Sequence, residues 1–315
     1  MNAPEKRTAS IPRIAGAGIC CLDRLFVSRR PAWGEITPVD EVRVQGGGLT
    51  ATALVAAARL GDEGLLLSYL GRDETGDIVA SELEAEGIDL AGVVRAGGVR
   101  SPFSFIHVDR ETGERTIFHH HARGTEEAGF PDLSPIAACD ALLVDDYYPR
   151  LARAAAEFAA RAGVPVVADV VSDLDRDLGF LRFADVLIAP RKFASRLGRA
   201  DDLDAALEAI HALGPATAVI TLGAEGWVYS ARGAKGRGRA FEVEVVDTTG
   251  AGDAFHGAFA HGLARKWSVD RAAEFAAAVA ALKCGRIGGR TGLPSLAATL
   301  EFLRARGRLD WGFPD

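Results

Sequence analysis

The chain has 315 residues, of which 48% are hydrophobic and 25% charged, so it can bury a large core and has the composition of a globular protein. Its 36 basic and 43 acidic residues leave a net charge of −7, which argues against a nucleic-acid partner. Its four cysteines have neither a disulfide pattern nor CxxC spacing, which indicates a reducing cytoplasm, and no apolar run approaches the length that spans a membrane.

The N-terminal segment predicts a leader and then a buried strand. Residues 1–12 lack the apolar stretch of a signal peptide and are expected to be disordered. Residues 13–21 alternate apolar and small side chains and stop just before Asp23, which predicts the first strand. Gly16 and Gly18 begin a GxG pattern, but Cys21 stands where a dinucleotide fingerprint requires glycine. We therefore assign no dinucleotide site here.

The next stretch predicts exposed strands on both sides of a helix. Residues 34–45 alternate like a partly polar strand pair, and residues 93–121 resemble a run of strands separated by turns. Between them, three glycines at 46–48 precede a helix of small residues that closes at Gly61. A strand at 65–70 and a helix that runs through Glu86 follow.

Strands alternate with helices from residue 132 onward. The expected strands are 141–144, 165–169, 186–189 and 216–221, and the expected helices are 151–161, 173–183, 193–198, 203–213 and 270–284. This alternation predicts right-handed crossovers and a parallel sheet that is covered by helices on both faces. Ligands of such sheets bind beyond the carboxyl ends of the strands.

Residues 245–263 carry the strongest chemical signal. A β-branched run (Val243, Val245 and Val246) predicts a strand that ends at Asp247, the turn Gly250-Ala251-Gly252 follows, and Asp253 opens an apolar helical pattern. The first amides of a helix lack intrahelical partners, so a glycine turn at this point can bind an anion. A phosphate there would lie beside Asp253, which suits phosphoryl transfer to a hydroxyl with the carboxylate as base. An acid in a first helical turn is also favourable as a cap, so GAGD alone leaves both interpretations open.

The longer string DTTGAGD, followed by an Ala/Gly-rich helix, resembles the C-terminal signature of the ribokinase-like (PfkB) carbohydrate kinases. The resemblance extends in order from about residue 13 to 303. It implies a single domain over residues 13–310, with an αβα sandwich around a mostly parallel sheet and a small antiparallel β lid formed by about 34–45 and 93–121. It also implies a sugar kinase that uses ATP and Mg²⁺, with Asp253 as catalytic base and the amides of Gly250, Ala251 and Gly252 as the anion hole.

On the sugar side, the resemblance implies that Asp23 holds substrate hydroxyls in a fork, although a solvated loop acid is the plain alternative. Gly47 and Gly48 would bring the backbone against the sugar. Thr52 stands where family members commonly carry asparagine, so its substrate contact would differ. The remaining residues expected to face the sugar are His119 and Tyr147. His119 and His121 share one strand face without ligand-spaced partners, so we predict no metal there.

On the nucleotide side, TLGAEG resembles the family segment T-x-G-x-x-G, for which a plain β-turn is the alternative. The residues expected near ATP are Thr221, Gly223, Gly226, Lys283 and Gly285. Asp247 and Thr249 would hold a monovalent cation such as K⁺. Pro190 and Phe193 occupy the ends of the usual N-x-x-E motif, so no metal role carries over there.

The triple glycine, Thr52 and the tail ALKCGRIGGRTGLP are most similar to the ketohexokinase and sulfofructose kinase branch, which implies a ketose phosphorylated at a primary hydroxyl. A nucleoside kinase is the first alternative, because Phe103, Phe105, Phe118 and Tyr148 could stack on a base. A non-catalytic sugar- or nucleotide-binding protein is the second. Exposed lid edges would pair between two copies, so we expect a homodimer.

Overall fold

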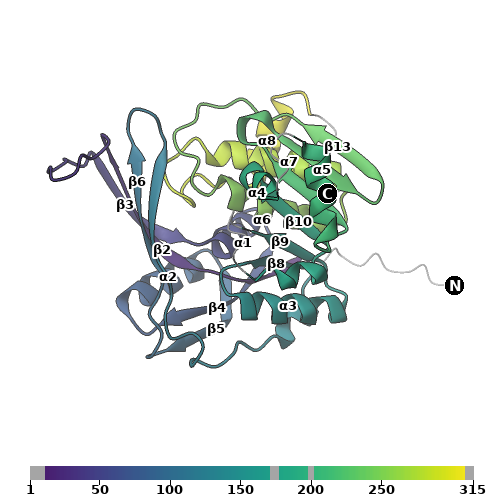
Figure 1. Ribbon diagram of the computed structural model, residues 1–315, viewed down its shortest axis with the longest axis horizontal. Coiled ribbons are helices and arrows are strands. Elements are labelled where there is room, and N and C mark those ends of the chain that lie inside the picture. The colour runs from purple at the N-terminus through teal and green to yellow at the C-terminus, as the bar shows by residue number, and fades with distance from the viewer. Residues whose placement is uncertain (1–10, 171–176, 198–201, 309–315) are drawn as a thin grey trace.

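The computed structural model describes residues 11–170, 177–197 and 202–308 and contains two sheets (Figure 1). Within these residues the larger sheet has nine strands, in the spatial order β13 (Ala234–Gly238), β12 (Trp227–Ala231), β11 (Thr217–Thr221), β10 (Val186–Pro190), β9 (Val166–Asp169), β8 (Ala141–Asp145), β1 (Arg13–Ala17), β4 (Glu63–Gly71) and β5 (Ile88–Ala96). The pairings from β11 to β5 are parallel, and β12 and β13 are antiparallel additions at one edge. Residues 1–10 of the predicted leader lie outside the described residues.

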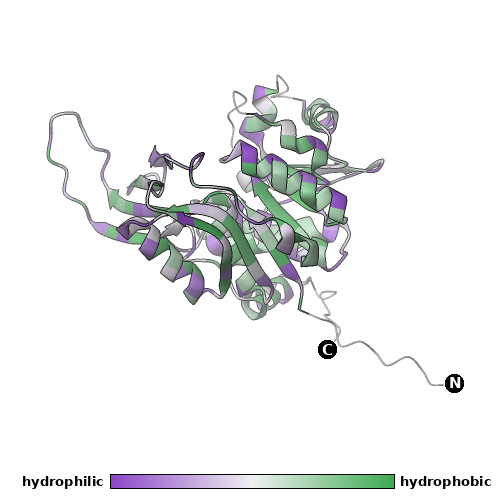
Figure 2. Ribbon diagram, turned by 90° about the horizontal axis from the view of Figure 1, so that it is seen from below, coloured by the Kyte–Doolittle hydropathy of each residue, from purple (hydrophilic) through white to green (hydrophobic). Residues whose placement is uncertain are grey.

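Helices cover both faces of the large sheet. One face packs against α1 (Leu49–Arg59), α2 (Glu74–Ala85), α6 (Ala251–Ala264), α7 (Val269–Lys283) and α8 (Leu296–Arg304). The other face packs against η1 (Ser134–Ala138), α3 (Pro149–Ala162), η2 (Gly179–Phe183), α4 (Arg191–Arg196) and α5 (Leu203–Ala212). Consecutive strand residues alternate between the two cores, as Ile14 and Ala15 do, so both faces of the sheet are apolar (Figure 2). The predicted three-layer αβα fold is confirmed.

The close packing of α6 on α1 depends on a glycine. A side chain on Gly257 would place its Cβ 2.1 Å from the carbonyl oxygen of Ala53 in α1. Because Gly257 has no side chain, the two helices approach closely. This contact lies one turn beyond Asp253, so it fixes the N-terminal end of α6 against the rest of the core.

The smaller sheet has the order β3 (Glu41–Gly47), β2 (Cys21–Ser28), β6 (Phe103–Asp109) and β7 (Arg115–His120). Its β2–β3 and β6–β7 pairs are antiparallel, as predicted, whereas β2 and β6 are parallel. The predicted lid bounds need correction in three places. β2 belongs to this sheet, β5 belongs to the large sheet, and residues 34–40 form no strand. Residues 29–40 instead form a long loop that projects from the molecule (Figures 1 and 2).

The strand predicted over residues 13–21 is two strands in different sheets. β1 ends at Ala17, and a side chain on the next residue, Gly18, would place its Cβ 2.2 Å from an Asp145 carboxylate oxygen. The chain turns there and enters the small sheet at Cys21. Residues 173–176 of the predicted helix 173–183 lie outside the described residues, and its described end is the 3-10 helix η2. Similarly, residue 198 of the predicted helix 193–198 is not among the described residues, and α4 begins two residues earlier, at Arg191.

Candidate active site

The predicted anion hole is a left-handed glycine turn followed by a helix. The strand predicted before the turn is wrong, because residues 241–248 form an irregular segment in which Val245 and Val246 are exposed. Gly250, with a φ of 77°, precedes the first residue of α6, and a side chain there would place its Cβ 2.7 Å from the backbone of Gly289. This conformation strongly favours glycine. The amide of Ala251 donates to the carbonyl of Thr248 at 3.2 Å, so one of the three predicted anion-binding amides is already hydrogen-bonded. The positive end of the α6 dipole remains at this point.

Asp253 lies in the first turn of α6 and is partly exposed. Desolvation by the surrounding protein, followed by the charge of Asp169, raises the pKa of Asp253 to about 8, while His256 lowers it. His256, one turn along the same helix, contacts the carbonyl oxygens of Gly252 at 2.8 Å and Ile188 at 3.1 Å. These contacts tie the first turn of α6 to β10. A partly exposed carboxyl group with a pKa of about 8 can exchange protons near neutral pH.

Asp247 is held by its own loop and by the loop that follows α7. One carboxylate oxygen accepts the amide and hydroxyl of Thr249 at 2.8 and 2.7 Å, and the other accepts the amide of Gly288 at 2.7 Å. Although burial opposes ionisation, the Gly288 and Thr249 amides and the Lys283 charge give Asp247 a lowered pKa. The ammonium group of Lys283 donates to the carbonyl of Asp247 at 2.8 Å. Because a carboxylate oxygen can accept more than one partner, these contacts do not test the K⁺ site at Asp247 and Thr249, which stays a prediction.

Asp23 and His119, both predicted to bind sugar, lie in one row of the small sheet. The register pairs Asp23 of β2 with Ser104 of β6, and Ser104 with His119 of β7, so the three side chains share one face. Ser104 Oγ contacts His119 Nδ1 at 3.1 Å. Asp23 is 7% exposed, and burial raises the pKa of its carboxyl group.

Tyr147 joins this row to the large sheet. Its hydroxyl contacts His119 Nε2 at 2.7 Å and His121 Nδ1 at 3.0 Å, and it accepts the amide of Ala122 at 3.2 Å. Tyr147 follows the carboxyl end of β8, so the contact closes the end of β7 onto the strand ends where ligands of parallel sheets bind. The structure therefore brings the predicted residues His119 and Tyr147 into direct contact.

At each position of the triple-glycine turn, a different neighbouring atom excludes a side chain. Side chains on Gly46 and Gly47 would place their Cβ atoms 2.0 Å from Arg290 Nη1 and from Asp23 Oδ2, respectively. Gly48 has a φ of 93°, and its Cβ would lie 2.5 Å from the carbonyl oxygen of Ile19. The backbone of Gly47 therefore packs directly against the predicted sugar-binding carboxylate. We found no sequence signal for Arg290, because it lies in a glycine-rich loop far along the chain.

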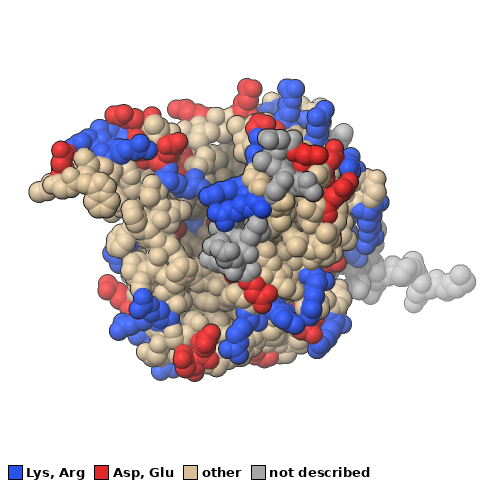
Figure 3. All heavy atoms as spheres, in the orientation of Figure 1, with Lys and Arg blue, Asp and Glu red and all other residues tan. Residues whose placement is uncertain are grey.

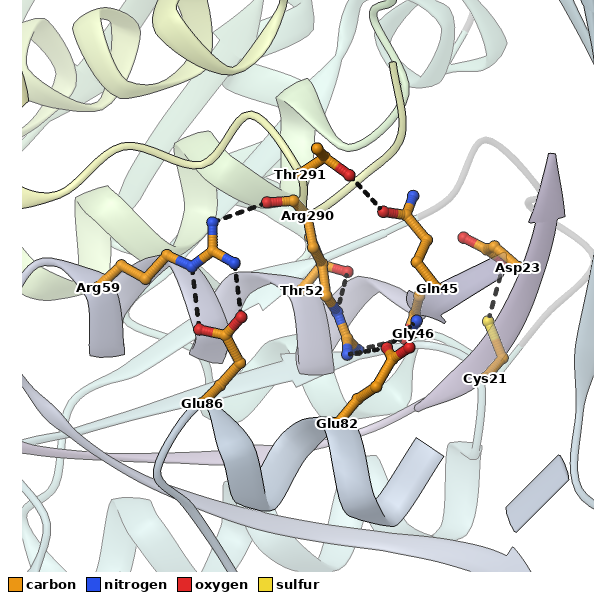
Figure 4. Close-up of polar contacts among 11 residues, drawn as sticks. Cys21, Asp23, Gln45, Gly46, Thr52, Arg59, Glu82, Glu86, Arg290 and Thr291 are labelled. Carbon is orange, nitrogen blue, oxygen red and sulfur yellow. Dashed lines mark hydrogen bonds and ion pairs between the residues drawn. The ribbon is translucent and has the colours of Figure 1, made fainter. Parts of the chain in front are cut away.

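Thr52 is buried behind this turn. It is 1% exposed, and its hydroxyl accepts Nε of Arg290 at 3.4 Å (Figure 4). The side chain thus faces Arg290 and is covered by protein where the resemblance implied a substrate contact.

Asp145 is a site residue whose role the sequence did not predict. It is fully buried, and one of its oxygens accepts the amide of Ile19 at 2.8 Å and the hydroxyl of Thr50 at 2.7 Å. The other accepts the amide of Tyr147 at 2.9 Å. Asp145 thus joins the turn after β1, the start of α1 and the end of β8. The sequence signal that could have identified Asp145 is its position directly after an apolar run that predicts a strand.

The predicted nucleotide residues divide into two groups. Thr221 ends β11, and Gly223 and Gly226 bracket the turn η3 (Gly223–Glu225) with positive φ angles of 61° and 100°. A side chain on Gly226 would place its Cβ 2.0 Å from the carbonyl oxygen of Gly238. Packing within the fold therefore requires glycine here, whether or not a nucleotide binds. Lys283 is fully buried, so no part of it is exposed to a nucleotide, whereas Gly285 lies on the exposed loop after α7.

Two open pockets adjoin parts of the predicted site, one beside Thr248 and one beside Tyr147. A cavity of about 800 Å³ separates the β6–β7 turn from the chain before Gly250, and Arg115 crosses it to reach the hydroxyl of Thr248 at 2.5 Å. A second pocket of about 400 Å³ lies beside His121 and Tyr147. The face drawn in Figure 3 is hollowed beside the small sheet, with Lys and Arg side chains near the hollow. Among the described residues, no group of three or more His, Cys, Asp or Glu side chains is arranged to hold a metal ion.

Known proteins resemble this chain over most of its length. The model of the pfkB family carbohydrate kinases matches residues 13–296. The chain is 30% identical to a ribokinase of Haemophilus influenzae, covering 86% of this chain and 91% of that protein. It is 32% identical to an ATP-dependent ribose-1-phosphate kinase of Halopiger xanaduensis, covering 93% and 99%. Arabidopsis thaliana ribokinase, solved with ribose and ATP, has the same fold, with a TM-score of 0.81 at 22% identity over 94% of this chain and 99% of that one. The chain therefore belongs to the pfkB family of carbohydrate kinases and is an ATP-dependent kinase.

Proposed function

We propose that the protein transfers the γ-phosphoryl group of ATP to a primary hydroxyl of a small sugar, with Asp253 as the base. The observation that carries this proposal is the position of Asp253 in the first turn of α6, directly after the left-handed Gly250. A phosphoryl group at this helix end would meet main-chain N–H groups and the positive end of the dipole. The acceptor hydroxyl would then lie between the phosphorus atom and the Asp253 carboxylate.

The sugar would lie between this helix end and the row formed by Asp23, Ser104 and His119. An ionised carboxylate accepts two hydrogen bonds, so Asp23 can hold two neighbouring hydroxyls. The small sheet would act as a lid whose closure excludes water from the phosphoryl group. A ketose is the acceptor that the similarity to the ketohexokinase branch predicts, and the relatives' names add ribose and ribose 1-phosphate to the compounds to be tested.

Mg²⁺ would enter with ATP. This ion keeps several waters and is held mainly by phosphates and one or two carboxylates, so a site without three clustered protein ligands suits it. When bound, it would neutralise charge on the phosphates. The first turn of α6 would hold the γ-phosphate, and Asp253 would receive the proton.

A nucleoside acceptor is less well supported. The register that directs Asp23, Ser104 and His119 to one face directs Phe105 and Phe118 to the opposite face of the small sheet. Tyr148 packs edge-on against Tyr69 in the core. The aromatic side chains that could stack on a base therefore do not gather beside Asp23.

ADP release from Mg²⁺-ATP with a panel of acceptors tests the proposal. The panel contains D-fructose, sulfofructose, D-ribose, 2-deoxyribose, ribose 1-phosphate and adenosine. Turnover of a sugar with phosphate appearing on its primary carbon is the expected result. Turnover of adenosine alone would favour the nucleoside alternative, and ATP binding without turnover of any compound would favour a non-catalytic protein.

The rate should depend on pH through Asp253. A base must be ionised, and a pKa of about 8 leaves only about one tenth of it ionised at pH 7 in the free enzyme. We expect kcat/KM to rise about tenfold per pH unit up to about pH 8 and then to level off. Initial rates from pH 6 to 9.5 with saturating Mg²⁺ check this, and a flat profile between pH 6.5 and 8.5 would contradict it.

We also propose a homodimer formed through the outer face of the small sheet. Val42, Val44, Phe105 and Phe118 lie on the face opposite Asp23 and are 45–66% exposed. A second copy of the same face would cover this apolar surface. Sedimentation equilibrium should give twice the mass of the chain for the wild type and the mass of a single chain for Phe118→Lys. A monomeric wild-type protein at micromolar concentration would rule the dimer out.

The environment that we propose is the cytoplasm, because all four cysteines are buried and free. No helix among the described residues is both long and apolar enough to cross a membrane.

A further inference from the structure

Arg290 is a buried arginine at the back of the sugar-side glycine turn. It belongs to the loop between α7 and α8 and is 4% exposed. Its Nη2 donates to the carbonyl oxygen of Gly47 at 2.8 Å, and its Nε donates to Thr52. Figure 4 shows the side chain reaching from the loop to the level of Gly46 and Glu82. The arginine therefore contacts the turn on the side away from Asp23.

Glu82 of α2 completes the support of this turn. Its carboxylate accepts the amide of Gly46 and lies 4.0 Å from Arg290 Nη1. Glu82 and Arg290 thus bind two successive residues, Glu82 through the N–H of Gly46 and Arg290 through the C=O of Gly47. The charges compensate each other only while both side chains stay in place.

Hydrophobic packing alone would stabilise this position more simply than a buried charge. Removing a guanidinium from water is costly, and burial accordingly lowers the pKa of Arg290, while the nearby Cys21, Glu82 and Asp23 raise it. Within the described chain, Nη1 makes no hydrogen bond. Gly46 must also lack a side chain to admit this atom. Burying Arg290 costs free energy and also requires glycine at position 46. This combination indicates that Arg290 sets the geometry of the turn rather than adding to the stability of the fold.

The loop that carries Arg290 also contacts the phosphate side. Gly288 donates its amide to Asp247, and the backbone of Gly289 packs against Gly250 of the anion turn. Two residues later, Thr291 donates its hydroxyl to the side chain of Gln45 at 2.9 Å, next to the glycine turn. Residues 288–291 thus contact both the anion turn and the sugar turn.

We propose that Arg290 is a positioning residue that fixes the turn at Gly46 and Gly47, and through Gly47 the carboxylate of Asp23, at the correct distance from the anion turn. The contact that transmits this is direct, because Gly47 leaves no room for even a methyl group beside Asp23. The inference rests on the proposed function insofar as the turn contacts the sugar. Its structural half, the fixing of the turn, holds independently of the substrate.

The test compares Arg290→Met with Arg265→Met. Arg265 is a partly buried arginine at the far end of α6 that pairs with buried Asp62 at 2.7 Å, so its loss also strands an acid but far from the turn. D-ribose and D-fructose serve as acceptors. We expect Arg290→Met to raise the KM of the accepted sugar at least tenfold and to change the KM of ATP less than twofold. Arg265→Met should change neither.

Hydrogen exchange gives a second measurement that requires no turnover. The amides of residues 44–50 should exchange at least tenfold faster in Arg290→Met and at the wild-type rate in Arg265→Met. Wild-type exchange at 44–50 together with an unchanged sugar KM in Arg290→Met would overturn the proposal. If the wild type phosphorylates no sugar, the proposed function fails, whereas the exchange rates still decide whether Arg290 fixes the turn.

Two further variants separate positioning from stability. Glu82→Gln combined with Arg290→Met leaves no stranded charge and should recover thermal stability without recovering the sugar KM. Recovery of both would show that Arg290 acts on stability alone and would overturn the proposal. If Arg290→Met does not fold, Arg290→Lys keeps the positive charge on a single nitrogen but loses the planar fork. The proposal then requires that the sugar KM of Arg290→Lys be severalfold higher than that of the wild type.

Discussion

Asp253→Asn is expected to lower kcat by about 10²–10⁴-fold, the usual range for removing a general base. Asparagine has nearly the same shape as aspartate but cannot accept a proton from the acceptor hydroxyl. The carboxylate is ionised at a cost, since burial raises its pKa. The variant should therefore be at least as thermally stable as the wild type at pH 8.5. Steady-state kinetics with a saturating sugar measures the loss, and a thermal shift with Mg²⁺-ATP shows that nucleotide still binds.

Asp270→Asn is the matched control for this experiment. Asp270 is the acid in the first turn of α7, so it has the same relation to a helix N-terminus without belonging to the site. Its replacement should cost at most about 1 kcal/mol through the lost dipole interaction and should leave kcat unchanged. A loss of less than tenfold in Asp253→Asn would show that another group takes the proton.

The second large effect is expected at the two glycines of the anion turn, which should respond differently to alanine. At Gly250 the positive φ and the backbone of Gly289 leave no room for a side chain, so Gly250→Ala should cost about 1–3 kcal/mol of stability. It should also displace the anion-binding amides and lower kcat/KM by about 10²–10³-fold, as the loss of an oxyanion donor does.

Gly252 is exposed, has an ordinary φ, and leaves its Cβ position open, with no described atom beyond its chain neighbours and its own helix backbone within 4 Å. Gly252→Ala should therefore keep the melting temperature of the wild type. The added methyl group would stand where the phosphate approaches, so kcat/KM for ATP should fall at least tenfold. If Gly252→Ala retains kcat/KM within threefold, the phosphate does not approach the helix from this side.

The chemistry-bearing residues that could be predicted from the sequence are close together along the chain. Asp247, Gly250 and Asp253 lie within one short turn-helix segment, so their spacing alone predicts an anion turn with an acid beside it, although the strand expected before the turn does not form. The alternation of strands and helices after residue 132 likewise predicted the layers of the fold, because each βαβ unit is defined by local patterns. Both predictions used only short-range information.

The residues that escaped prediction depend on contacts between distant segments. Arg290 hydrogen-bonds to Thr52 and Gly47, which precede it by 238 and 243 positions in the sequence. Nothing in the loop of Arg290 therefore distinguishes it from a solvated basic residue. Lys283 looked available to a nucleotide, yet the chain folds its ammonium group onto Asp247. The division of residues 13–21 into β1 and β2 depends on Asp145, whose carboxylate occupies the space beside Gly18.

The span of the Arg290–Gly47 bond has a consequence for biosynthesis. The two residues are 243 positions apart, and at about 5–20 residues per second the glycine turn is made some tens of seconds before its arginine. Until then Arg290 is missing beside Glu82, and the turn lacks the hydrogen bond to the carbonyl oxygen of Gly47. A chain released by the ribosome just before residue 290 would contain Asp253, the proposed base, and both glycine turns. It would still lack the side chain that we propose sets the Gly46–Gly47 turn against the Gly250 turn, so this arrangement is completed only after residue 290 has been made.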